Sequence, residues 1–259
     1  MNKLDILNRD EFVSQIVKML EHISDNETST CFAINGTWGC GKSFVLDMLQ
    51  ENLEVIQSEK TFTDKYLVIR YNCWKYDYYE EPLVAIVSSI MSQIEEKTKL
   101  FPDSEKKRKT LGRLKAVGVS LLSVGADAVK ARTGIDFSKA YETIQKGAAE
   151  GVSAFETDHN YDVYFGFNKV LKVFGDLLHD ISEQYTIVFL VDELDRCLPE
   201  YSIKIMERLH HLMEGQTNII AIMAIDKNQL LSNVKQTFGF SNPDRVTLLT
   251  LSRVVLQFI

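Results

Sequence analysis

The stretch "AINGTWGCGKSFVLDML", residues Ala33 to Leu49, decides the fold of this 259-residue chain. It contains the spacing G-x-x-x-x-G-K-S between a short apolar run and an amphipathic run. This spacing, with a strand before it and a helix after it, is typical of a loop that binds phosphate. Glycines let the backbone curl so that successive N–H groups point at phosphate oxygens, and the positive end of the following helix adds to the attraction. The sequence therefore predicts a nucleotide-binding loop.

The side chains of the loop have separate expected tasks. Lys42 would neutralise charge on the β- and γ-phosphates, and the Ser43 hydroxyl would ligate Mg²⁺. Trp38 lies inside the loop, where it either flanks the nucleotide or packs against the protein. The predicted nucleotide-binding residues are those of the loop and the residue after it: Gly36, Thr37, Trp38, Gly39, Cys40, Gly41, Lys42, Ser43 and Phe44.

A second motif supplies two adjacent acids. The run "YTIVFLVDELD", Tyr185 to Asp195, is an apolar strand that ends in carboxylates. P-loop enzymes hold Mg²⁺ with an acid at the end of a buried strand beside the first, which assigns the metal to Asp192 together with Ser43. Glu193 follows directly, where a carboxylate can polarise an attacking water. Burying an unpaired carboxylate is costly, so this pair indicates a function rather than only a solvated strand end.

One short match concerns the choice of nucleotide. Asn2-Lys3-Leu4-Asp5 has the N-K-x-D pattern that reads guanine in GTPases. In GTPases that pattern follows a strand, whereas only Met1 precedes it here. The acidic motif also continues Leu194-Asp195, without the glycine of D-x-x-G. We therefore predict that the nucleotide is ATP.

Apolar strands alternate with helices along most of the chain. This alternation predicts an α/β fold with a parallel sheet that is covered on both faces. The first helix is expected to open with a capping box formed by Asn8 and Glu11. Strands are expected at 30–35, 66–74, 185–195 and 218–226, and helices at 8–23, from 43, at 82–94, 161–181 and 203–213.

Three further features resemble the KAP family of P-loop NTPases. The acidic motif reads D-E-L-D-R-C, Asp192 to Cys197, where the family has D-[DE]-L-D-R-C. Asn72 to Leu83 is similar to the family's N-x-W…E-P-L segment, and "IIAIMAID" is similar to its apolar run that ends in A-x-D. The resemblance covers most of residues 8–240. It implies a P-loop NTPase three-layer sandwich with a mostly parallel sheet, of the additional-strand, catalytic-glutamate type.

The same resemblance implies roles for single residues. It makes Glu193 the catalytic glutamate and puts Asp226, also counted as catalytic with Lys42, in a sensor-like position near the γ-phosphate. Arg196 is expected either to stabilise transition-state charge or, the interpretation that we prefer, to pair with Asp195 and hold the strand end. Two other residues are expected to brace the sheet edge beside the loop, Asn72 and Trp74.

Residues 101–159 are more than two βα units of ordinary loop length need between the two motifs, so we expect a helical insertion there. It would divide the P-loop domain into a first part, 1–100, and a second part, 160–259. Ala116 to Ala126 carries no charge, but a membrane-spanning helix needs about 20 apolar residues. We expect a soluble helical insertion. The alternative is a peripheral membrane or partner contact through 101–130, led by a run of basic residues.

Composition sets the remaining expectations. The net charge of −7 gives no general attraction to nucleic acid or to an anionic membrane. Four scattered cysteines argue against zinc and disulfides, and the first residues lack the apolar run of a signal peptide, so a cytoplasmic location is expected. Members of the family usually continue beyond the sensor strand into a helical region, whereas this chain stops at Ile259. We expect a fragment, a frameshifted product or a reduced member that a partner completes.

Two functional hypotheses follow. The first is a Mg²⁺-dependent ATPase that acts as a switch in a larger assembly, through a protein partner or self-association. Bacterial antiviral defence or signalling enters only by analogy with the family. The second is a nucleotide-binding interaction module with little or no hydrolysis of its own. A small-molecule kinase is disfavoured, because the helix after the acidic strand offers only Arg208 as a lid arginine.

Overall fold

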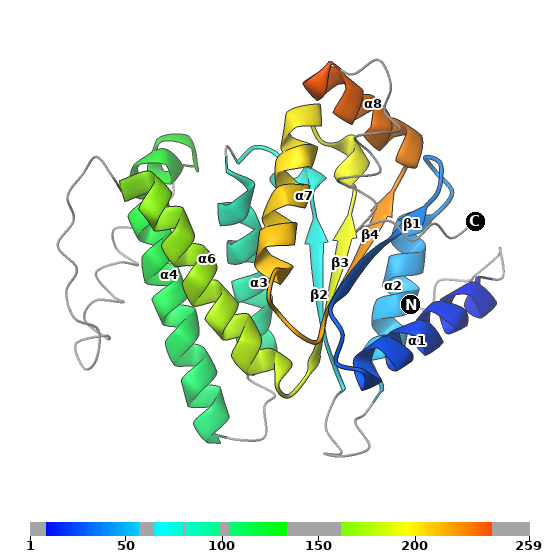
Figure 1. Ribbon diagram of the computed structural model, residues 1–259, viewed down its shortest axis with the longest axis horizontal. Helices are drawn as coiled ribbons and strands as arrows, with labels where there is room; N and C mark the ends of the chain where they lie inside the picture. Colours follow the sequence, from blue (N-terminus) through cyan, green and yellow to red (C-terminus); the bar gives the residue numbers. More distant parts are fainter. Residues whose placement is uncertain (1–8, 57–64, 80, 99–103, 134–161, 240–259) are drawn as a thin grey trace. The chain divides into compact units, whose positions relative to one another are not determined.

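The computed structural model describes residues 9–56, 65–79, 81–98, 104–133 and 162–239 (Figure 1). The chain divides into two compact units, one from residues 1–85 and 181–259 and the other from residues 86–180. We describe each unit by itself. The guanine-like motif at Asn2–Asp5 and residues 134–159 of the expected insertion lie outside the described residues.

Four parallel strands form the sheet of the first unit, in the order β1-β4-β3-β2 (Figure 1). Every residue of β3 and β4 is buried, because these two strands lie inside the sheet and both of its faces are covered. This confirms the predicted α/β fold with a parallel sheet. The bounds are β1 Thr30–Asn35, β2 Tyr66–Asn72, β3 Thr186–Asp192 and β4 Ile219–Ile225.

Strand β4 lies between β1, which leads into the phosphate loop, and β3, which ends in the acids. The expectation that the acidic strand lies directly beside the first strand is therefore wrong. The observed order is that of the additional-strand type of P-loop fold, which the family resemblance implied. Parallel strands end at the same edge, and here Asn35 pairs with Ile225 and Asn72 pairs with Asp192. Open α/β sheets bind their ligands at this edge.

Helices α1 (Asp10–Asp25) and α2 (Lys42–Glu54) cover one face of the sheet (Figure 1). Each helix buries a stripe of apolar residues that recur at helical spacing, and the stripes pack against alternate residues of the strands. This core includes Val13, Ile16, Leu20, Leu46, Leu49 and Leu53 from the helices and Phe32, Val68, Val188, Leu190, Ile220 and Ile222 from the strands.

The opposite face of the sheet is covered as well. Helices α7 (Pro199–Met213) and α8 (Lys227–Phe238) pack against each other, and Figure 1 shows α7 on the side of the sheet away from α1 and α2. With helices on both faces, the first unit is the three-layer sandwich that the resemblance implied. The strand residues that alternate with those of the first core are also buried: Leu67, Ile69, Ile187, Phe189 and Val191.

The predicted capping box at the start of the first helix is wrong. Helix α1 begins at Asp10 with Arg9 at the N-cap position, so Glu11 is its second residue and not its third. The Arg9 side chain makes no cap hydrogen bond. Its guanidinium instead donates to the carbonyl of Cys40, and its Cζ lies 5.6 Å from the centroid of the Phe44 ring. The helix thus begins one residue later than the capping box predicts, and the Arg9 side chain that precedes it contacts the phosphate loop, which is distant in sequence.

The second unit contains most of α3 (Pro82–Thr98), the helix α4 (Ser104–Thr133), and α6 (Asp162–Ser182) as far as Asp180. None of the described helices combines the length and the apolar composition of a transmembrane span. The boundaries of the insertion, 101–159, stay a prediction. The buried apolar residues of the second unit include Ile90, Ile94, Leu114, Val117, Val170, Phe174 and Leu177.

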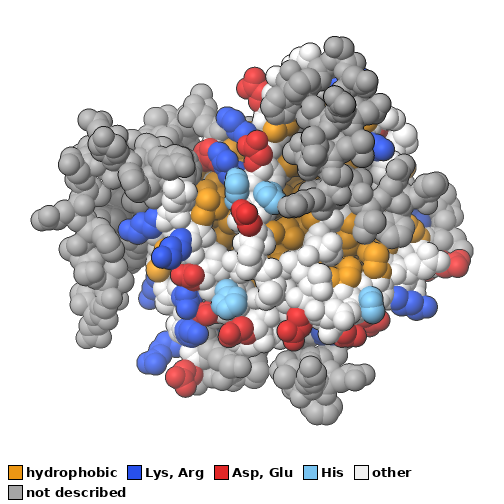
Figure 2. Space-filling view, viewed as in Figure 1, with side chains coloured by type: hydrophobic (Ala, Val, Ile, Leu, Met, Phe, Trp, Pro, Cys, Tyr) orange, Lys and Arg blue, Asp and Glu red, His pale blue; other side chains and the backbone are white. Residues whose placement is uncertain are grey.

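Two members of the basic run at the start of α4 have acidic partners within this unit. Lys109 Nζ lies 3.2 Å from Asp180, and Arg113 contacts Asp180 and lies 4.0 Å from Asp176. On the face shown in Figure 2, acidic and basic side chains of the described residues are interspersed. A membrane or partner contact through 101–130 stays a prediction, and part of its expected charge is neutralised within the unit.

Candidate nucleotide-binding site

The phosphate loop, residues 36–41, runs from the end of β1 into α2 with backbone geometry that only glycine adopts easily. Gly39 and Gly41 have φ angles of +80° and +90°. At Gly36 an added Cβ would lie 2.5 Å from the Sγ of Cys40, so a side chain does not fit there. Gly41 is the N-cap of α2, and no side chain caps this helix end. The amide groups of its first turn therefore face the loop, as a phosphate site requires.

Lys42 folds back over the loop. Its Nζ donates to the carbonyl of Gly36 at 2.8 Å and to that of Thr37 at 3.3 Å, and it lies 3.7 Å from Asp195 Oδ2. Both charged side chains are nearly buried, with 12% of Lys42 and 8% of Asp195 exposed. The ammonium group therefore spans the loop and the segment that follows the acids.

Asp192 ends β3 and is buried beneath the pocket. Its Oδ1 accepts the N–H of Glu193 at 3.0 Å, and its Oδ2 pairs with Arg70 Nη2 at 2.8 Å. Arg70 lies on β2 and also pairs with Asp47 of α2, at 2.7 Å from Nη1 to Oδ1. One guanidinium thus holds the acid at the end of β3 and the helix that begins at the phosphate loop.

Glu193 is constrained in both its backbone and its side chain. It has φ 59° and ψ 28°, in the left-handed region, where β3 turns into the short helix η2 (Leu194–Arg196). Oε2 accepts from Asn72 Nδ2 at 2.9 Å, and Oε1 pairs with Arg196 Nη1 at 2.9 Å. The Arg196 guanidinium lies 5.6 Å from the centroid of the Trp74 ring, which is half exposed. Both carboxylate oxygens therefore have protein partners.

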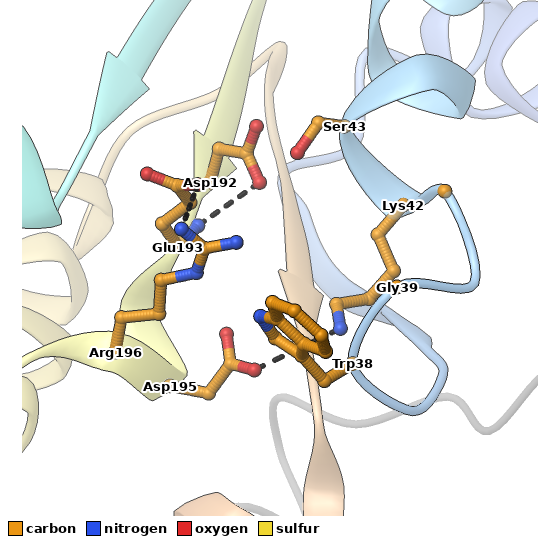
Figure 3. A pocket seen from close by; sticks show the side chains of 9 residues that line it. Trp38, Gly39, Lys42, Ser43, Asp192, Glu193, Asp195 and Arg196 are labelled. Carbon is orange, nitrogen blue, oxygen red and sulfur yellow. Dashed lines mark hydrogen bonds and ion pairs between the residues drawn. The ribbon is translucent and has the colours of Figure 1, made fainter.

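One pocket collects most of the predicted chemistry (Figure 3). It joins the phosphate loop and the start of α2 to the end of β3 and to η2, and in Figure 3 Asp192 points toward Ser43 and Asp195 points toward Lys42 across it. Four predicted loop residues do not line the pocket: Gly36, Thr37, Cys40 and Phe44. The lining residues are Trp38, Gly39, Gly41, Lys42, Ser43, Asp192, Glu193, Asp195 and Arg196.

Asp226 lies outside the lining of this pocket. It is the N-cap of α8, where its Oδ1 accepts the N–H of Asn228 at 3.0 Å and that of Gln229 at 3.4 Å. Its place after β4, the strand next to β1, is where a sensor-like residue is expected. A contact between Asp226 and the γ-phosphate stays a prediction.

Three expectations about neighbouring side chains can be compared with the structure. Trp38 is 77% exposed at the pocket, so the interpretation that it packs into the protein is wrong. Arg196 pairs with Glu193 and not with Asp195. Asn72 does more than brace the sheet edge, because its amide contacts Glu193 directly.

Sequence reasoning missed Arg70 and Asp47. For Arg70, the available signal was its charge inside the otherwise uncharged strand "YLVIRYN" of β2. It lies two residues before Asn72 and therefore on the same face of the strand. The spacing could not reveal its partners. They come from α2 and β3, 23 and 122 residues away along the chain.

Two buried thiols lie behind the acids. Cys73 follows β2, and Cys197 follows η2 with its Sγ 3.7 Å from the carbonyl oxygen of Glu193. Burial raises the pKa of Cys197 to about 12 and that of Cys73 well above its ordinary value. Both thiols therefore stay protonated at neutral pH, which suits packing and not nucleophilic catalysis or metal binding.

The fold and the site define the class: an α/β P-loop NTPase, which is a nucleotide-binding protein. A model of the KAP family P-loop domain matches residues 9–246, so this chain belongs to that family. No curated protein matches the sequence significantly. Among solved structures, the chain is similar to the ORC2 protein of Aeropyrum pernix, solved in ADPNP-ADP complexes, at 11% identity and a TM-score of 0.47. The match covers 98% of this chain and 48% of that one, so this chain spans about half of its length.

Proposed function

We propose that this chain binds ATP together with Mg²⁺, hydrolyses it, and acts as a switch within a larger assembly. The observation that carries the proposal is the pocket shared by Lys42, Ser43, Asp192 and Glu193, which brings the start of α2, after β1, to the end of β3, although β1 and β3 are not neighbours in the sheet. A phosphate loop with its lysine, two oxygen ligands for a metal and an acid beside the attacking water are the parts that phosphoryl transfer to water needs.

The oxygen atoms present in the pocket suit Mg²⁺. The hydroxyl of Ser43 and the carboxylate of Asp192 both line it. Each oxygen of Asp192 makes one hydrogen bond, to Arg70 or to the N–H of Glu193, and keeps a further lone pair. Mg²⁺ commonly binds one or two such protein groups and completes its octahedron with phosphate oxygens and water. When bound, it would neutralise charge on the β- and γ-phosphates.

Different residues of the chain would bind the phosphates, accept the proton and orient the base. The loop amides and Lys42 hold the β- and γ-phosphates. Glu193 accepts a proton from water while the water oxygen forms a bond to the γ-phosphorus. The bond from that phosphorus to the β–γ bridging oxygen breaks, so the products are ADP and phosphate. Asn72, which donates to Glu193 Oε2, orients the carboxylate for this step.

The test measures nucleotide binding and turnover on one preparation, by calorimetry and phosphate release. Lys42→Ala is expected to weaken binding at least tenfold and to abolish turnover. Glu193→Gln is expected to keep binding and to lose turnover at least a hundredfold, because general-base contributions are about 10²–10⁴. The matched controls are Lys204→Ala and Glu200→Gln, which make the same changes at exposed positions of α7. Unchanged turnover in Glu193→Gln would refute the assignment of the base.

A second candidate function is a nucleotide-binding interaction module with little hydrolysis of its own. The observation that favours it is the pairing of both Glu193 oxygens, with Asn72 and with Arg196. With both oxygens paired, an attacking water has to share the carboxylate with Asn72 or Arg196. This function predicts tight binding without turnover, and thermal stabilisation by ATP that Lys42→Ala removes. Sustained turnover in the isolated chain that Glu193→Gln removes would decide against it.

A further inference from the structure

Asp195 follows the end of β3, where an acid would ordinarily be exposed to solvent, but here it faces a lysine. Asp195 is nearly buried, and Lys42 is the one ion-pair partner that the described residues provide for it. Lys42 in turn directs its other contacts to two backbone carbonyls, those of Gly36 and Thr37. Among the described residues, Asp195 is therefore the one anion paired with the lysine of the phosphate loop.

A bound nucleotide needs the same ammonium group. Lysine offers three N–H donors on a flexible stem, and a phosphate group attracts all of them. A carboxylate that lies 3.7 Å from Nζ competes with phosphate oxygens for this charge and also repels them. In Figure 3 the Asp195 side chain points into the pocket from the side opposite the loop, toward Lys42.

We propose that Asp195 is an internal counter-ion that nucleotide must displace from Lys42, and that it thereby sets the affinity of the site for di- and triphosphates. The inference rests on the proposed function, because it concerns the same lysine. The lysine of a phosphate loop reaches the β- and γ-phosphates, which AMP lacks, so we expect Asp195 to weaken binding of ADP and ATP and to leave AMP unaffected.

Displacement of Asp195 from Lys42 has a structural consequence for Glu193, the proposed base. Once Lys42 turns to phosphate, Asp195 is left as a nearly buried charge without its partner, which is a costly state. The carboxylate must turn toward solvent, and η2, which carries it, also carries Arg196. Because Arg196 pairs with Glu193, movement of η2 changes that pair at the moment when nucleotide fills the loop. Asp195 thus links occupancy of the site to the state of the base.

The experiment titrates the whole chain with ADP, with a non-hydrolysable ATP analogue and with AMP, in the presence of Mg²⁺. Asp195→Asn removes the charge at nearly constant shape and is expected to tighten binding of ADP and of the analogue about tenfold, with no change for AMP. Glu200→Gln, which removes one negative charge from an exposed position, is expected to leave all three affinities unchanged. Asp195→Ser, with a small hydroxyl in place of the carboxylate, is titrated if the first variant does not fold.

The outcomes separate the inference from the proposed function. If the wild type binds ADP and neither charge-free variant binds it more tightly, the inference is overturned and the proposed function stands. Weaker binding in the variants would also overturn it, since Asp195 would then be positioning Lys42 for phosphate. If the wild type does not bind and a charge-free variant does, the inference is supported. If folded wild type and variants all fail to bind, both are refuted.

Discussion

Glu193 has two partners with different chemistry, and this difference determines what each does to the carboxylate. Asn72 donates from a neutral amide, which orients the side chain and leaves its negative charge in place. Arg196 is a cation whose ion pair occupies Oε1, the second oxygen of the carboxylate, so it competes with an attacking water for that oxygen. The ring of Trp74 beside Arg196 helps to keep the guanidinium there.

We expect Arg196→Gln to raise the rate of ATP hydrolysis about fivefold, because the base is freed from its cationic partner. Asn72→Ala is expected to lower that rate about tenfold, because the same carboxylate loses its orientation. Phosphate release at saturating ATP measures both variants. If both rates fall, Arg196 acts on transition-state charge, which is the interpretation that we did not prefer from the sequence.

The free thiols give a second prediction for single residues. Cys40 is exposed in the phosphate loop, whereas Cys73 and Cys197 are buried with raised pKa values. The thiolate is the reactive form. Burial also raises the pKa of Cys31, to about 12, so Cys40 is expected to react with a thiol reagent far faster than the other three at neutral pH, and bound nucleotide should slow its reaction. Loss of the fast phase in Cys40→Ser would verify the assignment, and fast labelling of the buried pair in the native chain would contradict it.

At the scale of elements, the end of β3 is tied to β2 and α2 through Arg70. The guanidinium bonds to Asp192 of β3 and Asp47 of α2, and it also donates to the carbonyl of Ser43 at 3.3 Å. Three elements that are far apart in sequence are joined in this way directly beneath the pocket. Such a tie fixes the distance between the two groups expected to share Mg²⁺, Ser43 and Asp192.

We expect Arg70→Met to lower the free energy of unfolding by about 2 kcal/mol, because it leaves the nearly buried carboxylate of Asp192 without a cationic partner. Urea denaturation measures this loss. A double-mutant cycle with Asp192→Asn is expected to show a coupling free energy of about 1–2 kcal/mol, since removing the charge removes the reason for the loss. Additive effects would show that Arg70 stabilises the fold independently of Asp192. Lys204→Met, at an exposed site on α7, serves as the control.

For the whole molecule, the stability of the fold should depend on pH above 9. Cys73 and Cys197 have pKa values raised by burial, from 9.0 to about 12 in the case of Cys197. In the unfolded chain these thiols ionise near pH 9, whereas in the native chain they stay protonated, so the native state binds more protons and loses stability as pH rises. The stabilisation is complete below pH 9. Between pH 9 and pH 10 each thiol should remove about 1 kcal/mol.

Urea denaturation at pH 8, 9 and 10 measures this dependence. The two thiols together lower the free energy of unfolding as pH rises. Cys197→Ala is expected to remove about half of this decrease, because one ionising group is lost from the unfolded state. A stability that does not change between pH 8 and pH 10 would show that the two thiols are accessible to ionisation in the native chain.

The sequence predicted the parts of the whole molecule that depend on local spacing. The phosphate loop, the buried strand that ends at Asp192 and the adjacent Glu193 are each contained in a few consecutive residues. The pairs Lys42–Asp195 and Arg70–Asp192 were not predictable, because they depend on the strand order β1-β4-β3-β2. The capping box at Asn8 and Glu11 was wrong because α1 begins one residue later than that spacing predicts, at Asp10.

The left-handed backbone at Glu193 implies a conflict between stability and activity. A non-glycine residue with φ near +60° costs roughly 1–2 kcal/mol, a cost that glycine would avoid. Glycine has no carboxylate, however, so the residue best suited to this turn would remove the proposed catalytic base. The chain therefore has the less stable residue, Glu193, directly after the end of β3. Engineering this protein for greater stability should therefore leave position 193 untouched and seek its gains elsewhere.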